Sequence, residues 1–261
     1  MFDTLSRRGF LGLTSGLAFA FPDFRQKADT PARESRAFPQ QEDDAVKDVV
    51  TVAHGNFARV KELVTARPAL ARASWDWGYG DWETPIDAAS HVGNRPIAEF
   101  LIANGARPTV FTAVMLGQLA LVKGFIEASP GIQRTRGPHG LTFVAHARAG
   151  GPAAAEVLKY LEALGDADPR YASVPLTDEE QAAIAGEYAF GDGATERVKV
   201  VKGERGFTIE RPGYSARGLA HQGGLVFNPA GAEAVRIEIR LTPVKTLTVR
   251  DGALVVTARA V

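Results

Sequence analysis

The chain has 261 residues, and its 30 lysines and arginines balance 30 aspartates and glutamates. Hydrophobic residues make up 45% and charged residues 23% of the sequence, which are globular proportions, so whole-chain disorder and a fibrous repeat are excluded. The absence of cysteine excludes a disulfide scaffold, and the balanced charge gives nucleic-acid binding little electrostatic support.

The N-terminus carries the pattern of an export signal. The pair Arg7-Arg8 precedes an apolar stretch from Phe10 to Phe21, and Ala18-Phe19-Ala20 has the small residues of a cleavage site. This order resembles a twin-arginine signal peptide, which implies export of the folded protein to the periplasm. Because a helix that spans a bilayer needs about 20 apolar residues, we expect cleavage of residues 1–20 and no stable membrane anchor.

A repeated pattern follows over residues 45–170, after a linker predicted at residues 21–44 from its proline, glutamine and charged residues. Four glycines lie between apolar helical patterns at spacings of 38, 24 and 34 residues: Gly55, Gly93, Gly117 and Gly151. Each unit therefore predicts a helix, a glycine turn and a second helix. One unit cannot bury its apolar face alone, so we expect stacked neighbours to supply the core.

Two segments in this region carry a more specific motif. Thr84-Pro85-Ile86-Asp87-Ala88-Ala89 and Thr142-Phe143-Val144-Ala145-His146-Ala147 resemble the T-P-L-H-x-A motif of ankyrin repeats, although Asp87 and Ala145 stand where that family has histidine. Thr84 is predicted to cap a helix through its hydroxyl, with Pro85 at the first helical position. The resemblance implies an ankyrin-repeat α-solenoid of about four repeats, which recognises a protein partner through its fingers and concave face.

All three tryptophans fall within one glycine-containing loop before Thr84. The loop runs Trp75-Asp76-Trp77-Gly78-Tyr79-Gly80-Asp81-Trp82, and we refer to residues 75–83 as the finger. Tryptophan and tyrosine are typical binding anchors, so the predicted partner-binding residues are Trp75, Trp77, Tyr79 and Trp82. We expect Trp77 and Tyr79 to be exposed at the tip. The alternative is that Trp75 and Trp82 pack onto the neighbouring helices.

The histidines show no recognisable metal-ligand spacing. No H-E-x-x-H segment occurs, so the sequence predicts neither a metal site nor a cofactor. His139 lies in the turn Gly137-Pro138-His139-Gly140 and is added to the predicted partner-binding residues, with simple solvation as the alternative. For His54 and His91, a role in helix packing is the default expectation.

The pattern changes after residue 176. Thr177 and Glu180 form a capping box that predicts a short helix, and apolar residues then alternate along runs separated by glycine turns. Residues 176–261 are therefore predicted to hold about eight antiparallel strands in a barrel or a closed sandwich. Together with the helical repeats, this makes the chain a multi-domain α+β protein.

Three short segments of this region carry a further resemblance: Gly186-Glu187-Tyr188, Phe190-Gly191 and Gly224-Leu225-Val226-Phe227. They resemble a small lipocalin-like domain that often follows serine β-lactamase-like enzymes. The resemblance implies an accessory module without chemistry of its own.

No catalytic motif accompanies these patterns. The sequence lacks S-x-x-K, G-x-S-x-G and phosphate-loop segments, so an enzyme is not expected. The predicted function is binding or scaffolding of a protein partner in the periplasm. A second hypothesis is that the β domain holds a small apolar ligand with the repeats as a docking platform, although side chains just fill a barrel of about eight strands.

Overall fold

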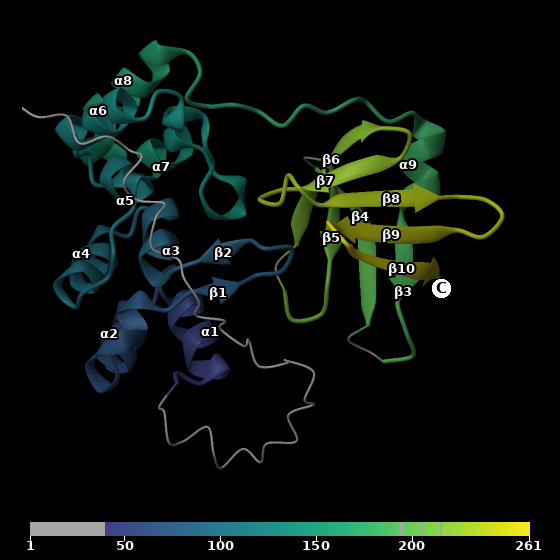
Figure 1. Cartoon of the computed structure of the whole chain (residues 1–261), viewed down its shortest axis with the longest axis horizontal. Helices are drawn as coiled ribbons and strands as arrows, with labels where there is room; N and C mark the ends of the chain where they lie inside the picture. The colour runs from purple at the N-terminus through teal and green to yellow at the C-terminus, as the bar shows by residue number, and fades with distance from the viewer. Residues whose placement is uncertain (1–39, 194–195, 205, 215) are drawn as a thin grey trace, which may run out of the picture. The chain divides into compact units, whose positions relative to one another are not determined.

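The computed structural model describes residues 40–193, 196–204, 206–214 and 216–261. Within these ranges nine α-helices precede a closed eight-stranded β-barrel, so the chain is an α+β protein. Figure 1 shows the helices in purple to green and the later strands in green to yellow. The predicted signal peptide at 1–20 and most of the predicted linker at 21–44 lie outside the described residues, and export stays a prediction.

The helical part starts inside the predicted linker, because the first helix begins at Asp43. Its helices are α1 (Asp43–Val52), α2 (Phe57–Ala66), α3 (Pro85–His91), α4 (Arg95–Ala103), α5 (Val110–Met115), α6 (Leu119–Ala128), α7 (Phe143–Ala149) and α8 (Ala155–Leu164). Their apolar faces form two buried clusters, one centred on Val60, Ile86 and Leu101 and the other on Val114, Phe143 and Leu161. Burial of these faces supplies the core that no single short helix could form.

The predicted ankyrin-repeat solenoid is wrong. The described chain has nine helices and a closed barrel, and no solenoid of equivalent repeats is evident. A solenoid requires each repeat to pack on its neighbour in the same way. Here a two-stranded hairpin and separate 3-10 turns interrupt the helix pairs, and the unequal glycine spacings of the sequence reflect these interruptions. The T-P motif marks a helix start, which is a local signal that many folds use.

The sequence signals correctly predict individual helix starts and turns. Thr84 caps α3 in a capping box with Asp87, and Pro85 occupies the first turn, as the sequence predicts. Gly93 and Gly117 both have φ of +74°, a left-handed conformation that glycine adopts without strain. A side chain at Gly93 would also collide with the Ala149 carbonyl, so this turn needs glycine for space as well as for conformation.

The C-terminal part confirms the predicted barrel and excludes the sandwich. After α9 (Asp178–Ile184), which Thr177 caps as expected, eight antiparallel strands close in the order β10-β3-β4-β5-β6-β7-β8-β9. They are β3 (Gly186–Ala189), β4 (Arg197–Gly203), β5 (Gly206–Glu210), β6 (Arg217–Gly223), β7 (Val226–Pro229), β8 (Arg236–Arg240), β9 (Thr246–Asp251) and β10 (Leu254–Ala260). The predicted alternation places Val198, Ile209 and Ile237 in the barrel core.

The segment that leads from α8 to α9 is hydrogen-bonded to the barrel. The Val174 N–H donates to the His221 carbonyl at 2.8 Å, and the Gln222 amide donates to the Ala172 carbonyl at 2.7 Å. The Gly231 N–H donates to the Tyr171 hydroxyl at 2.8 Å. Residues 171–174 therefore form a docked strap rather than a free linker.

Candidate metal centre

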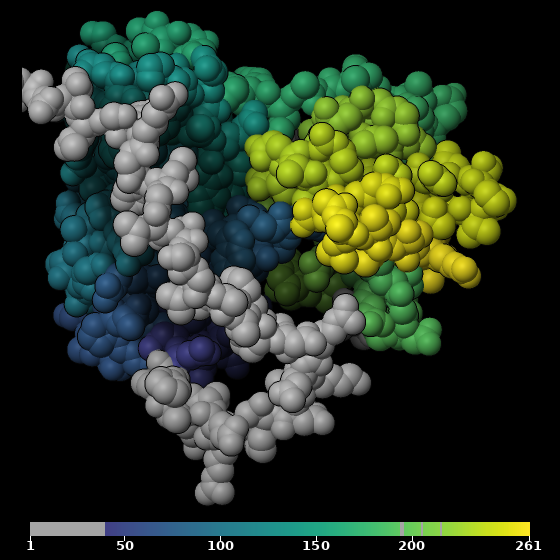
Figure 2. Space-filling view, in the orientation of Figure 1, coloured from purple at the N-terminus to yellow at the C-terminus, as the bar shows by residue number. Residues whose placement is uncertain are grey.

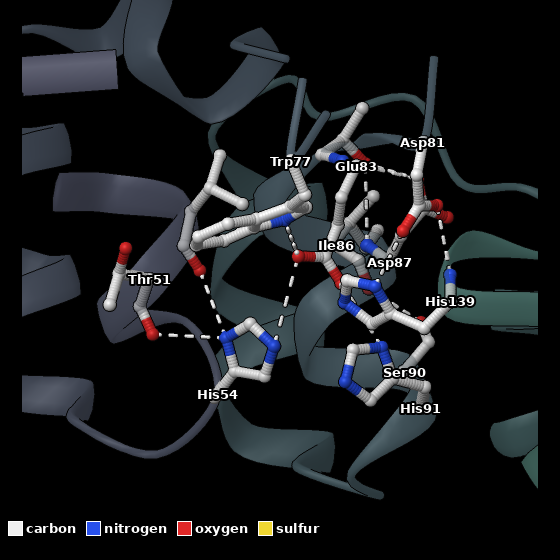
Figure 3. A network of polar contacts seen from close by, with 12 residues as sticks. Thr51, His54, Trp77, Asp81, Glu83, Ile86, Asp87, Ser90, His91 and His139 are labelled. Atoms are coloured by element: carbon white, nitrogen blue, oxygen red, sulfur yellow. Dashed lines mark hydrogen bonds and ion pairs between the residues drawn. The ribbon is translucent and has the colours of Figure 1, made fainter. Parts of the chain in front are cut away.

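Four side chains from separate segments converge in the helical part. His54 follows α1, Glu83 ends the hairpin strand β2 (Trp82–Glu83), His91 ends α3, and His139 lies in the turn Pro138–Gly140. One ligand atom from each of these residues lies within 4.8 Å of the ligand atoms of the others. Figure 3 shows the three imidazole rings beside the Glu83 carboxylate. We refer to these four residues as the His3Glu cluster.

The hairpin places Glu83 inside the protein. Strand β1 (Trp75–Asp76) pairs antiparallel with β2, with Trp75 opposite Glu83 and Asp76 opposite Trp82. Because successive side chains of a strand point to opposite faces, Trp82 is 60% exposed while the Glu83 side chain is fully buried. The capped helix α3 starts two residues later and carries His91 at its end, so α3 holds the second ligand at a fixed distance from the first.

His139 is held by its backbone as well as by its ring. Its φ of +60° is a left-handed conformation that is uncommon outside glycine. The buried Asp81 carboxylate accepts hydrogen bonds from both the His139 N–H, at 2.9 Å, and the ring Nδ1, at 2.8 Å. Asp81 also forms an ion pair with Arg217 of the barrel. The finger thus supplies one member of the cluster and the residue that orients another.

The buried carboxylate of Glu83 is the centre of the arrangement. Its Oε2 accepts a hydrogen bond from the Trp77 indole N–H at 2.7 Å and lies 3.7 Å from His54 Nε2. Its Oε1 lies 3.1 Å from His91 Nδ1 and 3.3 Å from His139 Nε2. Yet Glu83 Oε1 and His91 Nδ1 are buried atoms without a hydrogen bond of acceptable geometry in the described part of the chain. Buried polar atoms in that state call for a partner such as an ion.

Hydrogen bonds on the far side of two rings fix which nitrogen faces the cluster. His54 Nδ1 lies 3.0 Å from the Thr51 carbonyl and 3.2 Å from the Val50 carbonyl. A carbonyl only accepts, so this Nδ1 carries the proton and the Nε2 lone pair points toward Glu83. The Asp81 carboxylate likewise holds the His139 ring with its Nε2 toward Glu83. Metal-binding histidines commonly have this second hydrogen bond to a carbonyl or carboxylate.

The charges of the cluster favour a cation. Burial opposes ionisation of Glu83, but the short polar contacts with the His139 and His91 rings and their charge outweigh it and lower the Glu83 pKa to about 2. Burial also opposes protonation of His139, but the Asp81 and Glu83 carboxylates raise the His139 pKa to about 9. Glu83 is therefore an anion that draws positive charge into a buried site.

The ligand set suits a divalent transition metal. Imidazole and carboxylate are typical ligands of zinc, whose bonds of 2.0–2.1 Å in a tetrahedron place neighbouring ligand atoms about 3.3 Å apart. The contacts of Glu83 Oε1 with His91 Nδ1 and His139 Nε2, at 3.1 and 3.3 Å, lie close to that separation, whereas His54 Nε2 lies 3.7 Å from the other oxygen, Oε2, and the four ligand atoms lie within 4.8 Å of one another. The absence of cysteine removes the thiolate ligands that select copper(I) and iron–sulfur clusters.

The structure revises the expected exposure of the finger aromatics. Trp75 and Trp77 are half-buried against the helical core, and Tyr79 packs against the barrel core. The expectation of exposed Trp77 and Tyr79 is therefore wrong, because the Trp77 N–H turns inward to the buried Glu83. Trp82 is the exposed member. Partner binding by these residues and by His139 stays a prediction.

The cluster is not predictable from any local motif. His54 and His91 were expected to pack between helices, and Glu83 carries no signal of its own in the sequence. These residues are 29 and 8 positions apart, and His139 follows 48 positions after His91, so no local spacing links them. The available signal was the predicted start of α3 at Thr84, which places Glu83 and His91 at the two ends of one short helix.

Comparison with known proteins gives no relative: no family model matches the chain, and neither a curated protein nor a solved structure does. The resemblances to ankyrin repeats and to the accessory domain of β-lactamase-like enzymes therefore find no support at the family level. Among the residues that the structure describes, no helix has the length and apolar character needed to cross a membrane.

Proposed function

We propose that the protein binds one divalent transition-metal ion of the zinc class at the His3Glu cluster. The observation that carries the proposal is the convergence of three imidazoles on the fully buried carboxylate of Glu83. Hydrogen bonds to Thr51 and Asp81 already aim two of the Nε2 atoms inward. A divalent cation between these atoms would displace the proton that the raised pKa of His139 retains at neutral pH and would form coordinate bonds to the ring nitrogens and to Glu83.

The proposed ion has a structural role. Four protein ligands complete a tetrahedral zinc shell, whereas catalytic zinc sites keep a position for water. The ligands come from the end of α1, the hairpin, the end of α3 and the turn at Pro138–Gly140. One ion would therefore tie four segments together, and its binding free energy would add to the stability of the helical part.

Competition titration tests the proposal. The full chain, freed of metal with a chelator, is titrated with Zn²⁺ against a chromophoric chelator at neutral pH. We expect one equivalent to bind, and we expect His91→Ala and Glu83→Gln each to weaken binding. His221→Gln is the matched control, since His221 lies on β6 and donates to the Val174 carbonyl at 2.9 Å. Unchanged affinity in both cluster variants, or equal loss in the control, would reject the site.

Recognition of a protein partner through the finger is a second proposal, favoured by the 60% exposure of Trp82. An exposed tryptophan beside a structured hairpin is a suitable anchor for another protein. Capture from a periplasmic extract with wild type and Trp82→Ala tests this role. The substitution should remove any specific partner while it leaves zinc affinity unchanged, and a partner retained by Trp82→Ala rejects Trp82 as the anchor.

A further inference from the structure

The inward side chains of the barrel do not fill it at one end. Along β10, Ala258 is fully buried, Val256 is 39% exposed and Leu254 is 58% exposed. These three residues share a face because side chains alternate along a strand. The register pairs Ala258 with Leu247 and Val256 with Val249, and both partners belong to the barrel core. The exposed Val256 and Leu254 thus continue the inner face toward an open mouth.

A cavity of about 500 Å³ occupies this mouth. Its apolar wall consists of side chains from three strands, from the residue that follows β3 and from the finger: Val198, Val249, Leu254, Val256, Phe190 and Tyr79. Figure 2 shows the C-terminal strands, in yellow, at the surface that faces the viewer. Ligand pockets commonly occupy about 300–1,000 Å³ and lie in the mouths of β-barrels. The size and the apolar wall suit a small organic molecule.

One cation lies at the edge of this apolar wall. Arg211 follows β5 and continues the inner face of Phe207 and Ile209. Arg211 is half-buried as a residue, its guanidinium lies 4.5 Å from the centroid of the Tyr214 ring, and no carboxylate of the described residues lies at ion-pair distance from it. A guanidinium in that position favours a planar anion, which it can bind through two parallel hydrogen bonds.

The other charged residues of the cavity are engaged or solvated. Arg197 pairs with Glu187 at 2.7 Å, and Glu196 accepts a hydrogen bond from the Gly193 N–H at 3.1 Å. Asp251 is exposed at the turn between β9 and β10. Arg211 is thus the charged group that borders the apolar wall and is available to a ligand.

We propose that the barrel mouth binds a small amphipathic carboxylate. Its apolar body would lie against Val249, Leu254 and Val256, and its carboxylate would meet Arg211. This site uses no member of the His3Glu cluster, so the proposal is independent of the proposed metal binding.

Calorimetric titration of the full chain with decanoate, decanol and decylamine tests the proposal, in the presence of a chelator and again with Zn²⁺. We expect decanoate to bind most tightly. Val256→Trp should fill the cavity and weaken binding at least tenfold, whereas Val255→Trp, on the outer face of the same strand, should not. Arg211→Gln should weaken decanoate binding roughly tenfold to a hundredfold and leave decanol unchanged, with Arg240→Gln as the control.

The proposal would be overturned if decylamine bound as tightly as decanoate, or if decanoate did not bind at millimolar concentration. It would also be overturned if Val255→Trp and Val256→Trp weakened decanoate binding equally. Val255→Trp also shows whether a tryptophan on β10 is tolerated by the fold, because the two positions are adjacent on one strand.

Discussion

At the scale of single residues, Asp81 links the His3Glu cluster to the barrel. Its buried carboxylate accepts from His139 and pairs with Arg217. Burial opposes its ionisation, but the hydrogen bonds of His139 and the charge of Arg217 lower the Asp81 pKa. Asp81 thus positions His139 without being one of the proposed ligands.

Replacement of Asp81 should therefore weaken metal binding. We expect Asp81→Asn to reduce zinc affinity roughly tenfold to a hundredfold, the usual cost of losing the residue that orients a ligating histidine. Competition titration measures this change. Arg217→Met is the control, because it removes the other partner of Asp81 and leaves the His139 contact in place. An equal loss in both variants would assign the effect to the ion pair and not to the orientation of His139.

His146 is a buried histidine outside the cluster that makes stability depend on pH. Its Nδ1 donates to the Thr142 carbonyl at 2.8 Å, and its buried Nε2 has no partner in the described structure. Burial dominates over that hydrogen bond and lowers the His146 pKa from 6.5 to about 4. Between these values the unfolded chain binds a proton that the folded chain does not.

The contribution of His146 to the free energy of unfolding is fully present above about pH 6.5 and is lost as pH falls toward about 4. Urea unfolding of the metal-free protein at several pH values in this window should show the decline. His146→Phe, which keeps a ring beside Phe111, should have a shallower dependence on pH. Parallel curves for the two proteins would show that His146 does not titrate as described.

At the scale of elements, the finger presents one tryptophan to solvent and also carries the buried Glu83 of the His3Glu cluster. Its aromatic residues suggested a binding loop, and one of them, Trp82, is exposed. The others pack inward, because the buried Glu83 needs a hydrogen-bond donor and the Trp77 indole N–H supplies it. Local signals correctly predicted the cap at Thr84 and the left-handed glycines. They did not predict the inward turn of Trp77, which depends on contacts with residues distant in the sequence.

Two matched substitutions isolate the Trp77 hydrogen bond. Trp75 and Trp77 pack on the same apolar cluster, but the buried indole nitrogen of Trp75 has no acceptor within the described ranges. Trp77→Phe and Trp75→Phe remove the same atoms, so we expect Trp77→Phe to cost about 1.5–3 kcal/mol more in urea unfolding, the range for a hydrogen bond to a charged group. Equal costs would mean that Glu83 does not depend on this donor.

The barrel was the more predictable element. Alternating apolar residues and glycine turns identify strands because the pattern repeats every two residues within each strand. The same pattern could not show that the inner face of β10 becomes exposed at Val256 and Leu254, since exposure depends on how far the opposite strands extend.

The prediction of a helical repeat was wrong for a related reason. Helix–turn–helix units occur in many folds, and only their mutual packing distinguishes a solenoid.

At the scale of the whole molecule, the strap at residues 171–174 decides how separable the helical and barrel parts are. The hydrogen bonds to β6 and to Gly231 identify this segment as docked on the barrel. A protease needs an extended, detached segment of chain, so these bonds should slow cleavage.

Digestion of the full chain with proteinase K measures that protection. We expect slow cleavage at 171–174 in the wild type and faster cleavage in Tyr171→Phe, which loses the hydroxyl that accepts from Gly231. A matched control is Tyr160→Phe, on α8 away from the strap. Rapid cleavage in wild type, at the same rate as in Tyr171→Phe, would show that the strap is not held.

X-ray absorption at the zinc K-edge tests the proposed metal centre through the atoms that surround the ion. The protein is loaded with one equivalent of Zn²⁺ and freed of excess metal. We predict four nitrogen and oxygen neighbours at about 2.0–2.1 Å with the multiple-scattering signature of three imidazoles, and one imidazole fewer in His91→Ala. A shell of water and carboxylate oxygens alone, or loss of zinc from the wild type during removal of excess metal, would contradict zinc binding by the His3Glu cluster.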